Sequence, residues 1–499
     1  MDQTKAPLFA AIAGHLKGNP TSFHVPGHKS VPPAENADSA VFFRGALALD
    51  LTELPGLDDL HHPQGAILEA EKLAAACFGA DETHFLVGGS TSGNLALILA
   101  VCAANDLIIT QRNVHKSVLN GLMLAEASVV FLPPKIDPRT GVACGVEPEA
   151  VRAALTRFPE AKAVLLTNPN YYGMAMDLRA ITEMVHSFGK PVLVDEAHGA
   201  HFAFHPGLPP SALSCGADAA VQSTHKLLSA MTMGAMLHLQ GDLLDRESIR
   251  WHLAALQSSS PSYPIMASLD LARREAALYG RDKIAQGLAA VETFHRLLAE
   301  MPWFYAEAQA SRQPAFFARD PFKVILHDRT GTISGPQLLA ELARDGCFAE
   351  MADPLNTVVV FSLHSTAADA VKLARSLRRI SADWRLAKKE LPVFAANNNI
   401  YTPFANIQSL STVSFREWRR LQRKADATVA VKLHSAIGCR SAEAVIPYPP
   451  GIPLVYPGEI ITPEAVAAID QLSACETRFQ GCSDPTANTV NIFKMTMQK

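Results

Sequence analysis

The chain has 499 residues, of which 48% are hydrophobic and 18% charged, a composition typical of globular proteins with a large core. Its formal net charge of −4 excludes the strongly basic surface that nucleic-acid binding requires. Eight cysteines without CxxC pairs indicate neither a disulfide framework nor a zinc knuckle, and they fit a reducing compartment. Residues 1–16 lack the pattern of a signal peptide, and no apolar run is long enough to span a membrane. We therefore expect a cytoplasmic protein that binds neither nucleic acid nor a membrane.

The first part of the chain predicts an irregular arm followed by an α/β region. Residues 1–50 are rich in Pro, Gly and His, and we interpret them as an N-terminal arm. From Ile67 onward apolar residues recur at helical spacing, and a short apolar run at 85–87 leads into a Gly-Gly turn. Further apolar runs alternate with segments of helical composition, at 107–110, 129–132, 163–167 and 192–195. This alternation predicts an α/β domain whose mostly parallel sheet is covered on both faces.

The pattern changes near residue 280, where longer helices follow with a few strands, such as 323–326 and 357–363. We therefore predict an N-terminal arm (1–50), a large domain (51–280) and a smaller C-terminal domain region (281–499). Several strands of the large domain end in polar residues. Because ligands of open α/β sheets bind beyond the carboxyl ends of the strands, a site is expected there.

One such place is the run GGSTSGN at 88–94, between a predicted strand and an apolar helix. Glycines let the backbone approach an anion, hydroxyls donate to it, and a helix N-terminus favours negative charge. The run is compatible with phosphate binding, although ordinary turns share its composition.

Three further side chains have residue types that suit a cofactor with an aromatic ring and an aldehyde. Asp195 closes a buried strand and could keep a pyridinium nitrogen protonated, or it could be a helix cap or a structural ion-pair partner. Lys226, in STHK, could form a Schiff base, although most lysines are merely solvated. His115 could stack on a flat ring, although a lone histidine is more often structural.

Together these segments resemble the ornithine/lysine/arginine decarboxylase family, which are pyridoxal-phosphate enzymes of fold type I. The matching segments follow the family order over nearly the whole chain: HVPGHK at 24–29, LDDLH at 57–61, GSTS at 89–92, RNVHKS at 112–117, TNPNYYG at 167–173, VDEAHGAH at 194–201, STHK at 223–226, SSSPSY at 258–263 and IPYPPGIPLVYPGE at 446–459. The resemblance implies an aminotransferase-like large domain that binds pyridoxal 5'-phosphate and a smaller α+β C-terminal domain. It also implies decarboxylation of a basic amino acid (arginine, lysine or ornithine) to the amine and carbon dioxide.

The resemblance assigns roles to individual residues. Lys226 is expected to carry the cofactor, Asp195 to pair with the pyridine nitrogen, and His115 to stack over the ring. Ala197 is expected against the other ring face, and His198 near the phenolic oxygen. The residues expected to hold the phosphate carry hydroxyl or imidazole groups: Ser90, Thr91, Ser92, Ser223 and His225.

The resemblance also bears on partners and on the substrate. Ser260 is expected to reach the cofactor of a partner subunit, which implies a homodimer or a higher homo-oligomer with shared active sites. Carboxylates that could meet the distal cation of an amino-acid substrate are Asp58, Asp59 and Glu459.

Two features depart from the family pattern. The larger inducible members carry an additional N-terminal domain that this sequence does not show, so their large assemblies are not assumed for this chain. Many members have Thr-Gln after the lysine where this chain has Thr232 and Met233, a departure that bears on substrate or reaction control.

Three alternatives stay open. The same cofactor pocket serves amino transfer or oxidation of a basic amino acid. A metal hydrolase could use Asp195, His198, His201 and His205, but Gly199 interrupts a helical ligand face, and we predict no metal site. A non-catalytic protein that keeps the fold is disfavoured by the retained lysine, aspartate and phosphate loop.

Overall fold

The computed structural model describes residues 1–32, 37–306, 312–386, 412–423, 427–448, 452–474 and 477–494. The chain divides into two compact units. Unit 1 comprises Met1–Ala100 and Leu193–Asp282, and unit 2 comprises Val101–Val192 and Lys283–Lys499. The division into an arm and two domains at residues 50 and 280 stays a prediction. Within the described ranges, no helix combines the length and the apolar character needed to cross a membrane.

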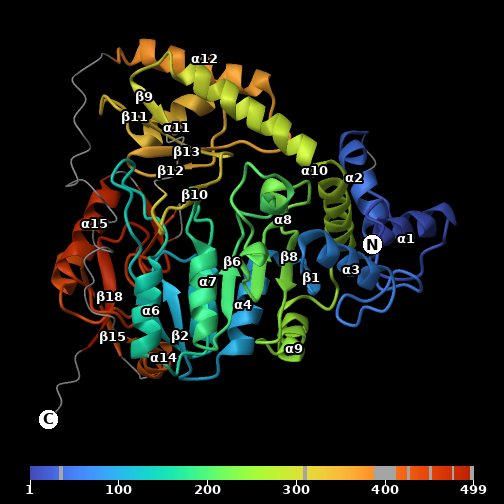
Figure 1. Ribbon diagram of the computed structural model, residues 1–499, viewed down its shortest axis with the longest axis horizontal. Coiled ribbons are helices and arrows are strands. Elements are labelled where there is room, and N and C mark those ends of the chain that lie inside the picture. The colour runs from blue at the N-terminus through green and yellow to red at the C-terminus, as the bar shows by residue number, and fades with distance from the viewer. Residues whose placement is uncertain are drawn as a thin grey trace. The chain divides into compact units, whose positions relative to one another are not determined.

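Unit 1 contains four adjacent strands of the main sheet, in the order β1–β8–β7–β6. Figure 1 labels β1, β8 and β6 of this group. Their bounds are β1 Glu82–Leu86, β6 Val192–Asp195, β7 Ala219–Gln222 and β8 Ala235–Leu239. Strands β6 and β7 are parallel, whereas β8 runs antiparallel to both β1 and β7. All residues of β6, β7 and β8 are buried, which explains their nearly continuous apolar sequences.

The helices of unit 1 are α1 Pro7–Lys17, α2 Ala37–Leu49, α3 Ala66–Phe78, α4 Gly89–Val101, α8 Thr224–Leu227, α9 Arg246–Leu256 and the first part of α10 Tyr263–Leu298. Helix α4 follows β1 directly and lies close to the sheet at Gly93. A Cβ atom at Gly93 would lie 2.8 Å from Cδ1 of Leu86 and 2.9 Å from Cγ1 of Val221. Glycine therefore permits the close contact between α4 and strands β1 and β7.

Unit 2 contains strands in the order β4–β2–β3–β14, with bounds β2 Leu107–Gln111, β3 Ser128–Leu132, β4 Val164–Thr167 and β14 Thr412–Ser414. Strand β2 is parallel to β3 and β4, and β14 is antiparallel to β3. Three helices accompany these strands in sequence: α5 Lys116–Leu124, α6 Pro148–Arg157 and α7 Leu178–Ser187. The alternation of strand and helix is that of an α/β fold.

Unit 2 also contains a four-stranded antiparallel sheet in the order β12–β13–β11–β9. Its strands are β9 Phe304–Ala306, β11 Lys323–Asp328, β12 Met351–Ala352 and β13 Asn356–Val360, with helices α11 Gly335–Arg344 and α12 Ala367–Asp383. The remaining elements are β5 Met174–Ala175, β10 Ala318–Arg319, α14 Phe415–Gln422, β15 Thr428–Lys432, β16 Ile446–Tyr448, α15 Pro463–Ser473, β17 Arg478–Gln480 and β18 Thr489–Phe493. The predicted α/β class is confirmed, and each apolar run named above overlaps a strand.

Candidate active site

Asp195 presents a buried carboxylate at the end of β6. The residue is 3% exposed. Nδ2 of Asn94 donates a hydrogen bond of 3.0 Å to Oδ2, and the backbone N–H of Ala197 donates one of 3.2 Å to Oδ1. Both donors are neutral, and in the described part of the chain no cation pairs with this carboxylate. Because burial of an uncompensated charge is costly, the position suits a ligand that brings a protonated nitrogen.

Lys226 and His198 meet in the loops that follow two neighbouring parallel strands. Lys226 lies on the short helix α8, directly after β7, and His198 lies in the loop after β6. Nζ of Lys226 is 2.9 Å from Nε2 of His198. The histidine is buried, whereas the lysine is exposed. Parallel neighbours deliver their following loops to the same edge, so this contact follows from the topology.

The hydroxyl groups predicted to hold a phosphate belong to the first turn of α4 and the end of β7. Oγ of Ser90 and Oγ of Ser223 lie 2.5 Å apart. Ser92 donates to the carbonyl of Gly89 at 2.9 Å, and Thr91 is exposed. The first backbone N–H groups of an α-helix have no partner within the helix, so the start of α4 provides donors beside these hydroxyls.

Thr224 is a candidate that the sequence analysis missed. Its Oγ1 is buried and has no hydrogen-bond partner among the described residues. A buried hydroxyl is normally satisfied, and a phosphate oxygen would satisfy it. The signal was present, because Thr224 lies between Ser223 and His225 in STHK.

The loop after Lys226 is tied to the start of α4. The carbonyl oxygen of Gly234 accepts two hydrogen bonds from His225, one from Nδ1 at 3.0 Å and one from the backbone N–H at 3.1 Å. Burial lowers the pKa of His225, the Gly234 carbonyl opposes this, and the charge of Lys226 adds to the lowering. The N–H of Gly89 donates to the carbonyl of Met233 at 3.0 Å. Met233 has a φ of 74°, which is energetically costly for a residue with a side chain. The residue that differs from the family pattern therefore lies in a strained backbone segment.

His115 belongs to unit 2, where it caps the N-terminus of α5. Its Nδ1 accepts from the backbone N–H of Ser117 at 3.1 Å and contacts Oγ of Ser117 at 2.9 Å. The ring is half-buried, and these contacts fix its orientation. Its stacking on a cofactor stays a prediction.

Asp58 and Asp59 organise the loop before α3. The carboxylate of Asp58 accepts backbone N–H bonds from Gln64 at 2.9 Å and Gly65 at 2.7 Å. Burial raises the pKa of Asp58, but these N–H donors outweigh it and lower that pKa overall. Oδ1 of Asp59 accepts from the backbone N–H of His61 at 2.8 Å. Asp58 therefore has a structural function in this loop.

Glu459, in unit 2, forms a two-pronged ion pair with Arg112. Nη1 and Nη2 of Arg112 donate to Oε1 and Oε2, each at 2.7 Å. The side chains are only 6% and 20% exposed. The backbone N–H of Tyr456 also donates to Oε2 at 3.0 Å, and the Tyr456 hydroxyl donates to the carbonyl of Arg112. Both oxygens of Glu459 are thus engaged, which favours a structural role; residues 449–451 of its motif lie outside the described residues.

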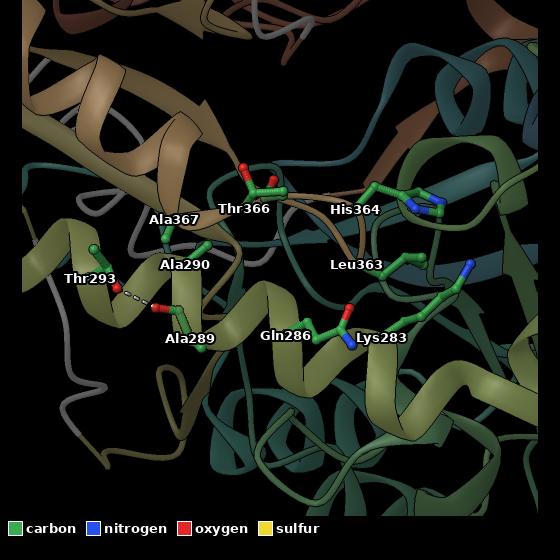
Figure 2. A pocket seen from close by; sticks show the side chains of 10 residues that line it. Lys283, Gln286, Ala289, Ala290, Thr293, Leu363, His364, Thr366 and Ala367 are labelled. Atoms are coloured by element: carbon green, nitrogen blue, oxygen red, sulfur yellow. Dashed lines mark hydrogen bonds between the residues drawn. The ribbon is translucent and has the colours of Figure 1, made fainter.

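Ser260 is exposed, and its backbone N–H donates to Oγ of Ser258 at 3.1 Å. Its approach to a partner subunit stays a prediction. Within the described ranges, no three His, Cys, Asp or Glu side chains gather as a metal site would require. A pocket of about 390 Å³ in unit 2, between α10 and the loop before α12, contains none of the predicted site residues (Figure 2).

The chain matches two family models, which are described as the Orn/Lys/Arg decarboxylase major domain, over residues 6–369, and the C-terminal domain of the same family, over residues 413–482. The Bacillus subtilis protein YaaO is 39% identical over 478 residues, covering 95% of this chain and 96% of its own. The arginine decarboxylase of Bacillus anthracis is 34% identical over 499 residues, covering 99% and 98%. The solved structure of lysine decarboxylase A from Pseudomonas aeruginosa has a TM-score of 0.83 at 23% identity, covering 98% of this chain and 80% of that one.

These matches confirm the predicted fold type I architecture and the predicted class of enzyme, an amino-acid decarboxylase. The major-domain model alone spans more than half of the sequence. The chain belongs to the ornithine/lysine/arginine decarboxylase family.

Proposed function

We propose that this chain decarboxylates a basic amino acid (arginine, lysine or ornithine) with pyridoxal 5'-phosphate as cofactor. The observation that carries the proposal is the arrangement in unit 1 of a buried carboxylate, Asp195, and a lysine, Lys226, that lies beside His198. Family membership and the arginine decarboxylase from Bacillus anthracis support the class of substrate.

The side chains that meet in unit 1 have the chemical groups that the cofactor requires. When bound, pyridoxal phosphate supplies an aldehyde that bonds to amines and a protonated ring that accepts the electrons of the broken bond. The carboxylate of Asp195 would hold the proton on the ring nitrogen, and Asn94 keeps that carboxylate oriented. The amine of Lys226 would bond to the aldehyde.

Phosphate binding is assigned to the start of α4 and to the STHK segment. The groups involved are the predicted hydroxyl and imidazole groups of Ser90, Thr91, Ser92, Ser223 and His225, together with the unsatisfied hydroxyl of Thr224. His115 and Ala197 are proposed to lie against the two ring faces.

Proton transfer is assigned to the pair of nitrogens at 2.9 Å. Nζ of Lys226 lies within hydrogen-bond distance of Nε2 of His198, so a proton for the α-carbon would pass through one of these two nitrogens. Because His198 is buried, it is positioned by the protein and not by solvent.

Of the three carboxylates proposed for the distal end of the substrate, Asp59 is the one that keeps an oxygen available. Asp58 is occupied by backbone donors and Glu459 by Arg112. Asp59 uses Oδ1 for His61, and within the described residues its Oδ2 accepts no hydrogen bond. A homodimer or higher homo-oligomer, in which Ser260 reaches the partner's cofactor, and a cytoplasmic location remain part of the proposal.

The test is carbon dioxide release from purified, cofactor-loaded protein offered arginine, lysine and ornithine in parallel. Release from one substrate, with the matching amine formed, supports the proposal and names the substrate. Formation of a keto acid without carbon dioxide, in protein that still shows the visible absorbance of the bound cofactor, assigns amino transfer or oxidation instead. A colourless protein that binds no pyridoxal phosphate overturns the proposal.

A further inference from the structure

A buried chain of hydrogen bonds crosses the four strands of unit 1. Oγ1 of Thr83 lies 2.8 Å from Nδ1 of His238, and Nε2 of His238 lies 3.1 Å from Oε1 of Gln222. Nε2 of Gln222 donates to Oε2 of Glu196 at 2.7 Å, and the backbone N–H of Ala212 donates to Oε1 of Glu196 at 2.7 Å. The four side chains are between 0% and 2% exposed. The chain is thus sealed from solvent.

The order of donors and acceptors in this chain follows for the ionised form of Glu196, whose pKa burial raises to about 8. Burial lowers the pKa of His238 to about 3, and His84 adds to the lowering, so the ring is neutral and carries one proton. When Glu196 is ionised, its carboxylate accepts the amide N–H of Gln222, so the amide oxygen of Gln222 accepts the N–H of Nε2 of His238. Nδ1 of His238 then accepts from the Thr83 hydroxyl. Because an amide does not pass protons on, the chain holds strands together and conducts no proton.

The chain lies behind the proposed active site. Glu196 directly follows Asp195, and side chains of successive residues in extended backbone point to opposite faces. The Glu196 N–H still pairs with the carbonyl of Val221, as in the strand. Gln222 directly precedes Ser223, and the next turn carries Lys226. A displacement of Glu196 therefore moves the backbone of Asp195, and a displacement of Gln222 moves that of Ser223, because one peptide bond joins each pair.

The packing around Glu196 supports this function. A Cβ atom at Gly199 would lie 2.7 Å from Cγ of Glu196, so the loop that carries His198 lies directly on the glutamate. The side chain of Glu196 thereby contacts two elements of the proposed site, the loop after β6 and, through Gln222, the end of β7.

We propose that Glu196 and Gln222 are positioning residues, which fix Asp195 and His198 relative to Ser223 and Lys226 through the complementary order of their donors and acceptors. This inference rests on the proposed function. Both side chains are sealed from solvent, so we assign neither a contact with the cofactor or the substrate, and each acts through its neighbours.

The test compares three variants of the full-length protein. Glu196→Gln removes the acceptor of the Gln222 amide N–H, so the bonds are kept only if that amide turns over and His238 changes tautomer. The exchange variant, Glu196→Gln with Gln222→Glu, restores every bond: the new amide can accept from the N–H of Ala212 and donate to the new carboxylate, which also accepts from His238. Glu71→Gln is the matched control, because Glu71 is another buried glutamate of unit 1 and, among the residues that the structure describes, accepts only the N–H of Phe85, at 2.9 Å.

Three kinds of measurement are made: the dissociation constant of pyridoxal phosphate, the pH dependence of the visible absorbance of the bound cofactor, and steady-state kinetics, which give kcat and KM. In Glu196→Gln we expect the rearrangement of the buried hydrogen bonds to lower cofactor affinity roughly tenfold, the order of one buried hydrogen bond, with a shifted absorbance titration and a lower kcat. The exchange variant should return to within about twofold of wild type, as coupled neighbours do. Glu71→Gln should match wild type in all three.

Two outcomes overturn the inference while leaving the proposed function intact. One is a wild-type protein that binds the cofactor and a Glu196→Gln variant with the same affinity and the same titration. The other is an exchange variant that folds but binds the cofactor no better than Glu196→Gln. If Glu196→Gln is insoluble, the exchange variant alone decides: wild-type cofactor affinity supports the inference, and a folded exchange variant with lost affinity overturns it. A wild-type protein that binds no pyridoxal phosphate overturns the proposed function itself.

Discussion

Nζ of Lys226 lies 2.9 Å from Nε2 of His198, a contact between two side chains that the parallel strands β6 and β7 deliver to the same edge of the sheet. The buried imidazole holds the end of a lysine whose residue is otherwise exposed. Such an orientation suits a nucleophile that must meet an aldehyde at one place and later handle a proton. The first prediction concerns this lysine.

Lys226→Ala should abolish both the visible absorbance of the substrate-free enzyme and the release of carbon dioxide, because the side chain that would bond to the aldehyde is removed. Absorption spectra and a carbon dioxide assay measure the two effects. Lys72→Ala is the control, since Lys72 is an exposed lysine of the same unit and should leave both unchanged. Undiminished turnover in Lys226→Ala would show that the assignment is wrong.

Asp195→Asn should leave the cofactor bonded to Lys226 but lower kcat by at least about 100-fold, the order of loss when one preorganised electrostatic group is removed. The neutral amide can no longer stabilise a protonated ring nitrogen. Asn94→Ala removes only the 3.0 Å hydrogen bond that orients Asp195, so its loss should be smaller. Equal kcat in Asp195→Asn and wild type would separate this carboxylate from the chemistry.

Gly93→Ala should lower the free energy of unfolding by about 1–3 kcal/mol, because its methyl group would press on Leu86 and Val221 in a packed interface. Denaturant unfolding of the apoprotein measures the change. Gly14→Ala is the control: Gly14 lies in α1, and a Cβ there meets nothing within 4 Å. That variant should be stabilised by about 0.5–1 kcal/mol, the gain in helix propensity. A Gly93→Ala variant as stable as wild type would show that α4 can move away from the sheet.

Much of this architecture could be predicted because it depends on local pattern. The apolar runs 107–110 and 192–195 overlap β2 and β6, since buried parallel strands are continuously apolar. The candidates Ser90 and Ser223, 133 residues apart, meet at 2.5 Å because both follow strand ends of one sheet. Motifs that end strands thus predict neighbours when the topology is α/β.

Contacts that depend on register or on long-range packing could not be predicted. The pairing of Asn94 with Asp195 requires α4 to lie against the sheet at one particular rotation. The partnership of Arg112 with Glu459 joins residues 347 apart, and nothing in either segment specifies the other. The sequence therefore allows Glu459 to be interpreted as a substrate ligand, because its pattern does not reveal that the guanidinium of Arg112 is buried beside it.

Arg112→Ala should lower the free energy of unfolding by about 3 kcal/mol or more, because the largely buried carboxylate of Glu459 would lose its ion-pair partner. Arg112→Lys keeps the charge but loses one of the two 2.7 Å bonds, so it should rank between Arg112→Ala and wild type. Glu459→Gln should lower stability and leave the preference among arginine, lysine and ornithine unchanged. Asp59→Asn should alter that preference. A changed preference in Glu459→Gln would return Glu459 to the list of substrate ligands.

The last prediction concerns pH and the buried carboxyl of Glu71. Burial raises its pKa from 4.5 to about 7, while His84 and the N–H of Phe85 oppose the shift. Below pH 4.5 the carboxyl is protonated in both the folded and the unfolded chain, so its titration does not reduce the free energy of unfolding there. Between pH 4.5 and 7 the unfolded chain gives up this proton and the folded chain keeps it, so the free energy of unfolding falls as pH rises.

Glu71→Gln removes this titration and can still accept the N–H of Phe85. Wild-type stability should therefore fall between about pH 5 and pH 8 by up to about 3 kcal/mol more than that of Glu71→Gln. Denaturant unfolding at several pH values measures the two slopes. Burial also raises the pKa of Glu196, to about 8, but that group is present in both proteins, so their difference isolates Glu71. Parallel stability curves for the two proteins would mean that Glu71 ionises in the folded chain as readily as in the unfolded one.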